Sequence, residues 1–288
     1  MPLLQLVNRY TRPTCFASSI RLGSSSLYPQ HLTSTPDLDT TTDITMSSTE
    51  ISIADRPEYP IGVPCKFSPD GVAQRYPGNT TVCHIPLNSL LQTGLRNVYN
   101  ALGSHPTLGK VIRLVPPESW HMTVLDGARE SECQPGMWPE DMEKKPLAES
   151  TADFTKSLRD LGRELSKEGL APPYRMRVRG FDAGIVGSGL EVEGATVEEE
   201  QRMRRLRDRL ADALGFRAPN HEIYQFHVTI AYLLRHVDGV DRMEFNRTLA
   251  KLLASVKVEF ELGAVEFCTF EDMCAYPRVF YLGAEDHH

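Results

Sequence analysis

Gln225-Phe226-His227-Val228-Thr229-Ile230-Ala231-Tyr232 and, about a hundred residues earlier, Ser119-Trp120-His121-Met122-Thr123-Val124-Leu125 are the two stretches that decide the fold. Both read apolar–His–apolar–Thr–apolar, and this alternation predicts a β-strand whose successive side chains point to opposite faces. Each strand therefore offers an imidazole and a hydroxyl side by side on an open face, with its apolar residues on the core face. By the same alternation Tyr232 belongs with the core face, and Trp120 is expected to pack inside.

The paired motifs resemble those of the 2H phosphoesterase superfamily, which is named for two His-x-Thr/Ser motifs on two strands of a bilobal fold. The resemblance covers about residues 60 to 285, and only the two motifs are specific. It implies an α+β domain over residues 61–285, with two lobes related by a pseudo-two-fold axis. It also implies largely antiparallel sheets that form a central groove, helices on the outer faces, and the two His and two Thr at the floor of the groove.

The residues outside the motifs predict the same fold class, because strands and amphipathic helices follow one another along the chain. Strands are expected at Thr80–Ile85, Val111–Val115, Tyr174–Phe181, Ile185–Val192, Val256–Leu262, Val265–Thr269 and Val279–Leu282. Helices are expected over 87–102, 154–165, 197–214 and 245–253, and the third carries five arginines on its expected solvent side: Arg202, Arg204, Arg205, Arg207 and Arg209. The Gly- and Pro-containing stretch Asp126–Glu149 predicts a long polar loop.

Composition narrows the function classes. The formal net charge of −7 over 288 residues argues against binding of duplex nucleic acid through a broad basic face. It is compatible with a small anionic substrate in a locally positive groove. No apolar run is long enough to span a membrane, so we expect no membrane partner, and we expect a monomer.

The six cysteines form no C-x-x-C pair and have no histidines near them at zinc-ligand spacing. We expect free thiols in a reducing compartment, and no metal site. The cysteines are Cys15, Cys65, Cys83, Cys133, Cys268 and Cys274.

The first 60 residues differ from the rest and are expected to be a disordered or targeting extension. From Met1 to Pro36 the chain holds Arg9, Arg12 and Arg21 but no Asp or Glu. This composition is typical of a mitochondrial transit peptide. A disordered extension, or translation that begins at Met46, explains it equally well, so the expected location is cytoplasmic or mitochondrial.

Two histidines and two threonines at one groove suit the hydrolysis of a phosphodiester. Histidine can take or give a proton near neutrality, so one of His121 and His227 would serve as base and the other as acid. The hydroxyls of Thr123 and Thr229 would donate hydrogen bonds to the non-bridging oxygens. This chemistry needs no metal or cofactor, and the residues leave open which histidine is the base.

The resemblance implies a substrate class, because many relatives act on 2′,3′-cyclic phosphates of nucleotides or RNA ends. Others degrade RNA from its 3′ end, and some only bind nucleotides; all three activities remain as hypotheses. His84, on an expected strand, and Arg177 and Arg179, on the arginine-bearing face of another, are possible substrate-binding residues. A structural histidine is the favoured interpretation of His84, whereas a solvent-facing strand edge explains the two arginines equally well.

Overall fold

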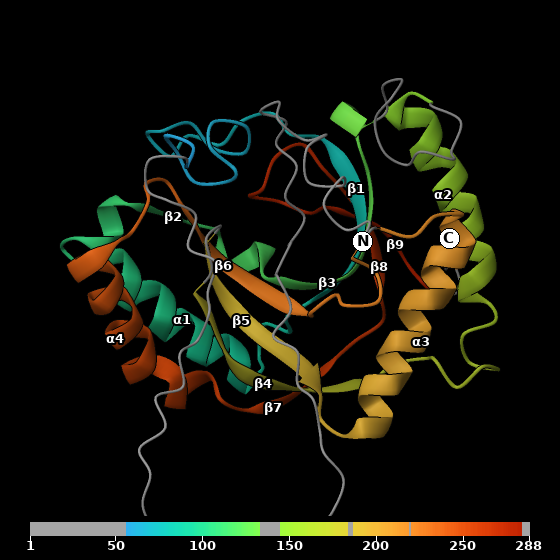
Figure 1. The fold of residues 1–288 in the computed structure, drawn as a ribbon. Helices are drawn as coiled ribbons and strands as arrows, with labels where there is room; N and C mark the ends of the chain where they lie inside the picture. Colours follow the sequence, from blue (N-terminus) through green and yellow to red (C-terminus); the bar gives the residue numbers. More distant parts are fainter. Residues whose placement is uncertain (1–55, 133–144, 184–186, 219, 284–288) are drawn as a thin grey trace, which may run out of the picture.

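The structure, a computed structural model, describes residues 56–132, 145–183, 187–218 and 220–283 (Figure 1). The expected N-terminal extension of residues 1–60 lies almost wholly outside the described residues. None of the described helices combines the length and the apolar composition needed to cross a membrane.

The strands of the described residues form one continuous sheet in which neighbouring strands run antiparallel (Figure 1). Its order is β7-β4-β5-β6-β3-β1-β8-β9, and β2 pairs with the remaining length of β6. The strands are β1 Gly78–His84, β2 Ile112–Leu114, β3 His121–Arg129, β4 Tyr174–Ala183, β5 Gly187–Gly194, β6 His227–Leu233, β7 Glu259–Leu262, β8 Glu266–Phe270 and β9 Arg278–Tyr281. The two motif strands, β3 and β6, lie side by side at the centre with three strands beyond each, which confirms the expected α+β architecture of two related halves.

The helices pack in two pairs, α1 with α4 and α2 with α3, which lie at the left and at the right of the molecule in Figure 1. The amphipathic patterns placed them correctly, and the observed bounds are α1 Leu90–Gly103, α2 Leu147–Gly162, α3 Val197–Leu214 and α4 Gly239–Val256. Three single turns of 3-10 helix are η3 Leu108–Lys110, η4 Pro117–Ser119 and η5 Glu130–Glu132. The helices bury the apolar residues of the motif strands, and Trp120 lies in this core as expected.

Each motif strand carries a β-bulge directly after its threonine. In β3, Thr123 pairs with Val82 and Leu125 with Thr81, so Val124 is an extra residue. A bulge reverses the alternation of side chains beyond it. Asp126 therefore returns to the face of His121, and β3 continues to Arg129, which corrects the expected loop from Asp126 to Glu149.

The bulge in β6 has the same place in the motif. Thr229 pairs with Gly189 and Ala231 with Ser188, which leaves Ile230 as the extra residue. Tyr232 consequently joins the face of His227 and Thr229, where it is partly buried. It packs against the main core and also against Phe67 of a second small cluster, with ring centroids 5.2 Å apart. The assignment of Tyr232 to the core face by simple alternation was wrong for this reason.

The carbonyl groups of the two bulged residues are satisfied by different donors. The backbone N–H of Val115 donates to the carbonyl of Ile230 at 3.0 Å. The guanidinium of Arg207 donates to the carbonyl of Val124 and stacks over Tyr224, 3.9 Å from its ring centroid. Arg207 is only 2% exposed, so its placement on the solvent side of α3 was wrong. A bulge leaves a buried backbone group unpaired, and α3 supplies the missing partner.

Cys83, Cys268 and Cys274 are free thiols, as expected. Cys65 is disulfide-bonded, so the expectation of six free thiols was wrong at that position. Cys15 and Cys133 lie outside the described residues.

Replacement of Gly189 by alanine should destabilise the sheet beside the second motif. A Cβ atom there would lie 2.5 Å from the carbonyl oxygen of Val228, whereas a Cβ atom at Gly180 on the neighbouring strand would meet nothing within 4 Å. We expect Gly189→Ala to lower the free energy of unfolding by about 1–3 kcal/mol, and Gly180→Ala to change it by no more than about 0.5 kcal/mol. Urea denaturation of both variants checks this, and equal midpoints would contradict the close approach of β5 and β6.

Candidate active site

The pairing of β3 with β6 brings the four motif side chains together. Met122 lies opposite Val228 in an antiparallel register. In this register His121 lies opposite Thr229, and Thr123 lies opposite His227, all on the face away from the helices. Diagonal neighbours on such a pair are about 7–8 Å apart, so the two imidazoles flank a space that suits one phosphate group.

The two histidine rings are held in the same way. Nδ1 of His121 lies 2.6 Å from the carbonyl oxygen of Ser119, and Nδ1 of His227 lies 3.1 Å from the carbonyl oxygen of Gln225. A carbonyl oxygen only accepts, so Nδ1 is the donor in both rings. Each neutral ring therefore has its lone pair on Nε2, the nitrogen that remains for a ligand.

A tyrosine contacts each histidine ring. Tyr276 meets His121 edge to face, with centroids 4.2 Å apart, and Tyr224 lies 5.9 Å from His227. The hydroxyl of Tyr224 also donates to the carbonyl of Thr123 at 3.4 Å, so this residue links the two motif strands. Burial raises the pKa of both phenols well above the ordinary value, which keeps them neutral donors.

The surroundings of His121 favour its neutral form. Burial lowers its pKa to about 4, the contact with the carbonyl of Ser119 opposes this shift, and the nearby rings of His84 and His227 lower the pKa further. The exposed area of His121 is intermediate, but Tyr276 and His84 occupy two sides of its ring and remove water from them. An imidazole that stays neutral at neutral pH is suited to accept a proton.

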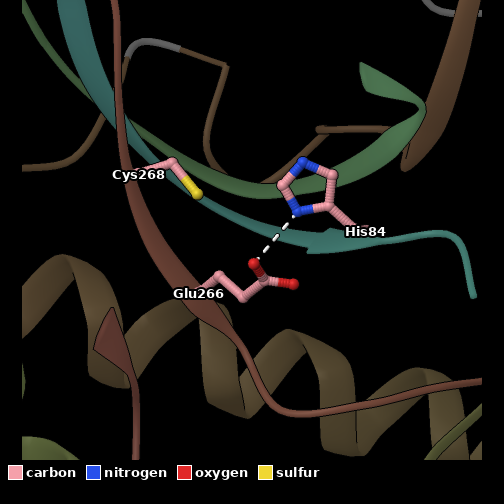
Figure 2. Close-up of side chains that lie close together, drawn as sticks. All are labelled: His84, Glu266 and Cys268. Atoms are coloured by element: carbon pink, nitrogen blue, oxygen red, sulfur yellow. Dashed lines mark hydrogen bonds and ion pairs between the residues drawn. The ribbon is translucent and has the colours of Figure 1, made fainter. Parts of the chain in front are cut away.

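His84 lies next to the four motif residues. It pairs with His121 across β1 and β3, and the two ring centroids are 5.8 Å apart. Its Nδ1 is 3.1 Å from a carboxylate oxygen of Glu266, and Figure 2 shows this contact. The same oxygen accepts from Arg278 at 3.1 Å. Nothing in the local sequence connects Glu266 with His84, because β1 and β8 are far apart in the chain.

Arg177 and Arg179 share the groove-bearing face but lie farther from the histidines. Arg177 is opposite Glu193 on β5, and both arginines form ion pairs with that carboxylate, at 2.7 Å and 3.8 Å. His227 is separated from them by β5, where Glu191 lies opposite it. The structure therefore brings His84 to the motif residues and leaves both arginines at the side of the face.

Among the described residues, two groups have potential metal-ligand atoms within 4.8 Å of one another: His84 with Glu266 and Cys268, and Asp208 with His221 and Glu222. In the first group the guanidinium of Arg278 already occupies the carboxylate of Glu266. Burial raises the pKa of the Cys268 thiol to about 12, so this sulfur stays protonated. Both features oppose a bound cation there. Figure 2 shows these three side chains.

Sequence reasoning missed Tyr224, Tyr276, Glu266 and Arg207. Tyr224 carried the clearest signal, because it stands three residues before His227 and ahead of the alternating run. The other three reach the site from different elements. Only the sheet order and the packing of α3 bring them there.

The sequence and the fold of this chain are similar to those of known proteins. Residues 66–185 match the 2H-phosphodiest family, described as a domain of unknown function (DUF1868). The crystal structure of the conserved protein of unknown function ATU0111 from Agrobacterium tumefaciens is similar over 80% of this chain and 96% of its own, with a TM-score of 0.69 and 26% identity. No curated protein matches the sequence.

Two more distant structures are also similar. TT0787 of Thermus thermophilus covers 74% of this chain and 100% of its own, with a TM-score of 0.42 and 16% identity. LigT of Escherichia coli, complexed with NADP+, covers 73% of this chain and 99% of its own, with a TM-score of 0.42 and 10% identity.

The stability of the protein should depend on pH through His121. Its pKa is about 4 in the folded chain and about 6.5 when unfolded, so the unfolded chain binds the proton more tightly. This contribution to stability is complete above about pH 6.5 and is lost as the pH falls toward 4, by up to about 3 kcal/mol. We expect His121→Gln to lose correspondingly less stability than the wild type between about pH 7 and pH 4.5 in urea titrations.

The matched control is His236→Gln, since His236 is partly exposed, lies beyond the end of β6 and is hydrogen-bonded to the carbonyl of Pro57. This variant should lose stability with falling pH as the wild type does. The same loss in His121→Gln would show that His121 is not desolvated.

Proposed function

Because this chain belongs to the 2H phosphoesterase superfamily, we propose that it is a metal-independent phosphodiesterase that hydrolyses 2′,3′-cyclic phosphates of nucleotides or RNA ends. The observation that carries the proposal is the matched pair of His-x-Thr strands. They are adjacent and antiparallel, and both histidines present Nε2 from the same face.

In the proposed reaction a water molecule attacks phosphorus in line with the leaving ribose oxygen. Nε2 of His121 accepts the proton of the water, and Nε2 of His227 donates a proton to the ribose oxygen as its bond to phosphorus breaks. The burial that keeps His121 neutral supports its assignment as the base. The anionic substrate would raise the pKa of this ring toward neutrality and so strengthen it as a base.

Thr123 and Thr229 would stabilise the negative charge that develops on the non-bridging oxygens. Each hydroxyl lies across the strand pair from the histidine of the other motif. Together they approach the phosphate from both strands, and hydrogen bonds there strengthen as charge accumulates in the transition state. The substrate is the only partner that this reaction requires, and the monomeric state and the compartment stay predictions.

Loss of either histidine should abolish most of the activity. We expect His121→Ala and His227→Ala to lower kcat about 10²–10⁴-fold on 2′,3′-cyclic AMP, measured in the presence of EDTA. His236→Ala is the matched control and should keep wild-type activity, because His236 lies beyond the end of β6 and contacts the carbonyl of Pro57. Full activity in either motif variant defeats the acid–base assignment.

Loss of either threonine hydroxyl should slow the chemical step more than it weakens binding. We expect Thr123→Val and Thr229→Val to lower kcat about 10²-fold, while Thr→Ser at the same positions keeps most of the rate. A change in KM alone would mean that the hydroxyls contact the substrate without stabilising the transition state.

The same experiments separate the two alternative functions. An exonuclease would produce a ladder of shortened products from an RNA oligonucleotide labelled at its 5′ end. A nucleotide-binding module would bind AMP in calorimetry and release no product. In this case the histidine variants would bind AMP more weakly, and there would be no turnover to lose.

A further inference from the structure

We propose that His84 is a third imidazole of the groove and binds a second anionic group of the substrate, beside the reacting phosphate. This inference rests on the proposed function and deepens it. It assigns the substrate to cyclic phosphates that carry a further phosphate, as an RNA end does, in preference to simple nucleoside cyclic phosphates.

The order of the strands places His84 beyond the reacting phosphate. Thr229, His121 and His84 form one row across β6, β3 and β1, because His121 lies opposite both of the others. Neighbouring strands are about 4.8 Å apart, and the rings of His121 and His84 are 5.8 Å apart. A phosphate between His121 and His227 therefore has His84 as its next neighbour on the β1 side.

The ring of His84 is held by a buried carboxylate. Glu266 is 5% exposed, and one of its oxygens accepts from both His84 and Arg278 at 3.1 Å. Burial favours the protonated acid, but the hydrogen bonds and charges of His84 and Arg278 outweigh it and hold the pKa of Glu266 below its ordinary value. An ionised carboxylate only accepts, so Nδ1 of His84 donates and Nε2 is the atom left for a ligand (Figure 2).

The charges on the two sides of the groove differ. On the β1 side, a proton on Nε2 would make the ring of His84 positive, and the carboxylate of Glu266 would compensate this charge. The guanidinium of Arg278 adds a half-exposed positive charge. On the β5 side, the residue opposite His227 is Glu191, and the arginines beyond it are paired with Glu193. An anionic extension of the substrate is attracted by Arg278 and by a proton on His84, so His84 is its expected contact on the β1 side.

The test compares 2′,3′-cyclic AMP with the same nucleotide carrying a 5′-phosphate. We expect the wild type to prefer the second substrate in kcat/KM by on the order of tenfold, the scale of one charge-assisted hydrogen bond. His84→Gln should remove this preference, so that kcat/KM falls more for the 5′-phosphorylated substrate than for 2′,3′-cyclic AMP. Glu266→Gln should reduce the preference, and the double variant should resemble His84→Gln, because Glu266 acts through His84.

The matched control is Glu244→Gln. Glu244 also contacts one histidine, His105 at 3.4 Å, and one arginine, Arg247, but it lies on α4. This variant should keep the full preference for the 5′-phosphorylated substrate. A similar loss in the control would mean that removal of any such carboxylate perturbs the enzyme.

A direct measurement on the unaltered protein covers the case in which a variant does not fold. In wild-type protein labelled with ¹³C-histidine, added 5′-AMP should shift the ring resonance of His84. This resonance is assigned as the one that is missing from the spectrum of His84→Gln. If that variant does not fold, it is assigned by the proximity of the His84 ring to the ring of His121. Three outcomes overturn the proposal. They are a His84 resonance that 5′-AMP does not shift, an equal loss of kcat/KM on the two substrates in His84→Gln, and a wild type that does not prefer the 5′-phosphorylated substrate. If neither cyclic substrate is hydrolysed while 5′-AMP still shifts His84, the proposed reaction fails and the anion site stands.

Discussion

The pairing of Met122 on β3 with Val228 on β6 is the contact on which the rest of the structure depends. Both side chains are fully buried against the helices, so the histidine and threonine on either side of each must point the other way. A slip of either strand by one residue would bury the histidine and the threonine of that strand and expose its apolar side chains. The hydrophobic effect that fixes this register therefore also places the site.

The bulges show how two strands of similar sequence are supported by different parts of the structure. Each follows its threonine directly, and each brings one more residue, Asp126 or Tyr232, to the groove-bearing face. The carbonyl that each bulge frees has its own partner: a side chain of α3 in β3 and the backbone beside β2 in β6. The pseudo-two-fold relation thus holds for the motif strands and not for the elements that support them.

This asymmetry extends to the chemistry. His121 has the rings of Tyr276 and His84 against it, whereas the hydrogen bond of His227 to the backbone is exposed. Burial penalises charge on His121, and this difference in environment, which the motifs do not contain, is what supports the proposed assignment of His121 as the base. The row of imidazoles continues to His84 on one side only, so the two sides of the groove differ in charge as well.

The helices, the strands and the four motif residues could be predicted from the residues alone, because short-range periodicity of apolar residues indicates which face of an element is buried. It failed where the alternation was interrupted: a bulge inside an apolar run, as at Val124-Leu125 and Ile230-Ala231, has no local signature, and Tyr232 was assigned to the wrong face as a result. It also failed for Arg207, because an arginine on a charged helix is exposed unless a distant carbonyl needs a donor. The contacts of Glu266 with His84 and of Tyr276 with His121 could not be predicted, since the sheet order that joins these residues follows from burial of the whole core and not from any one segment.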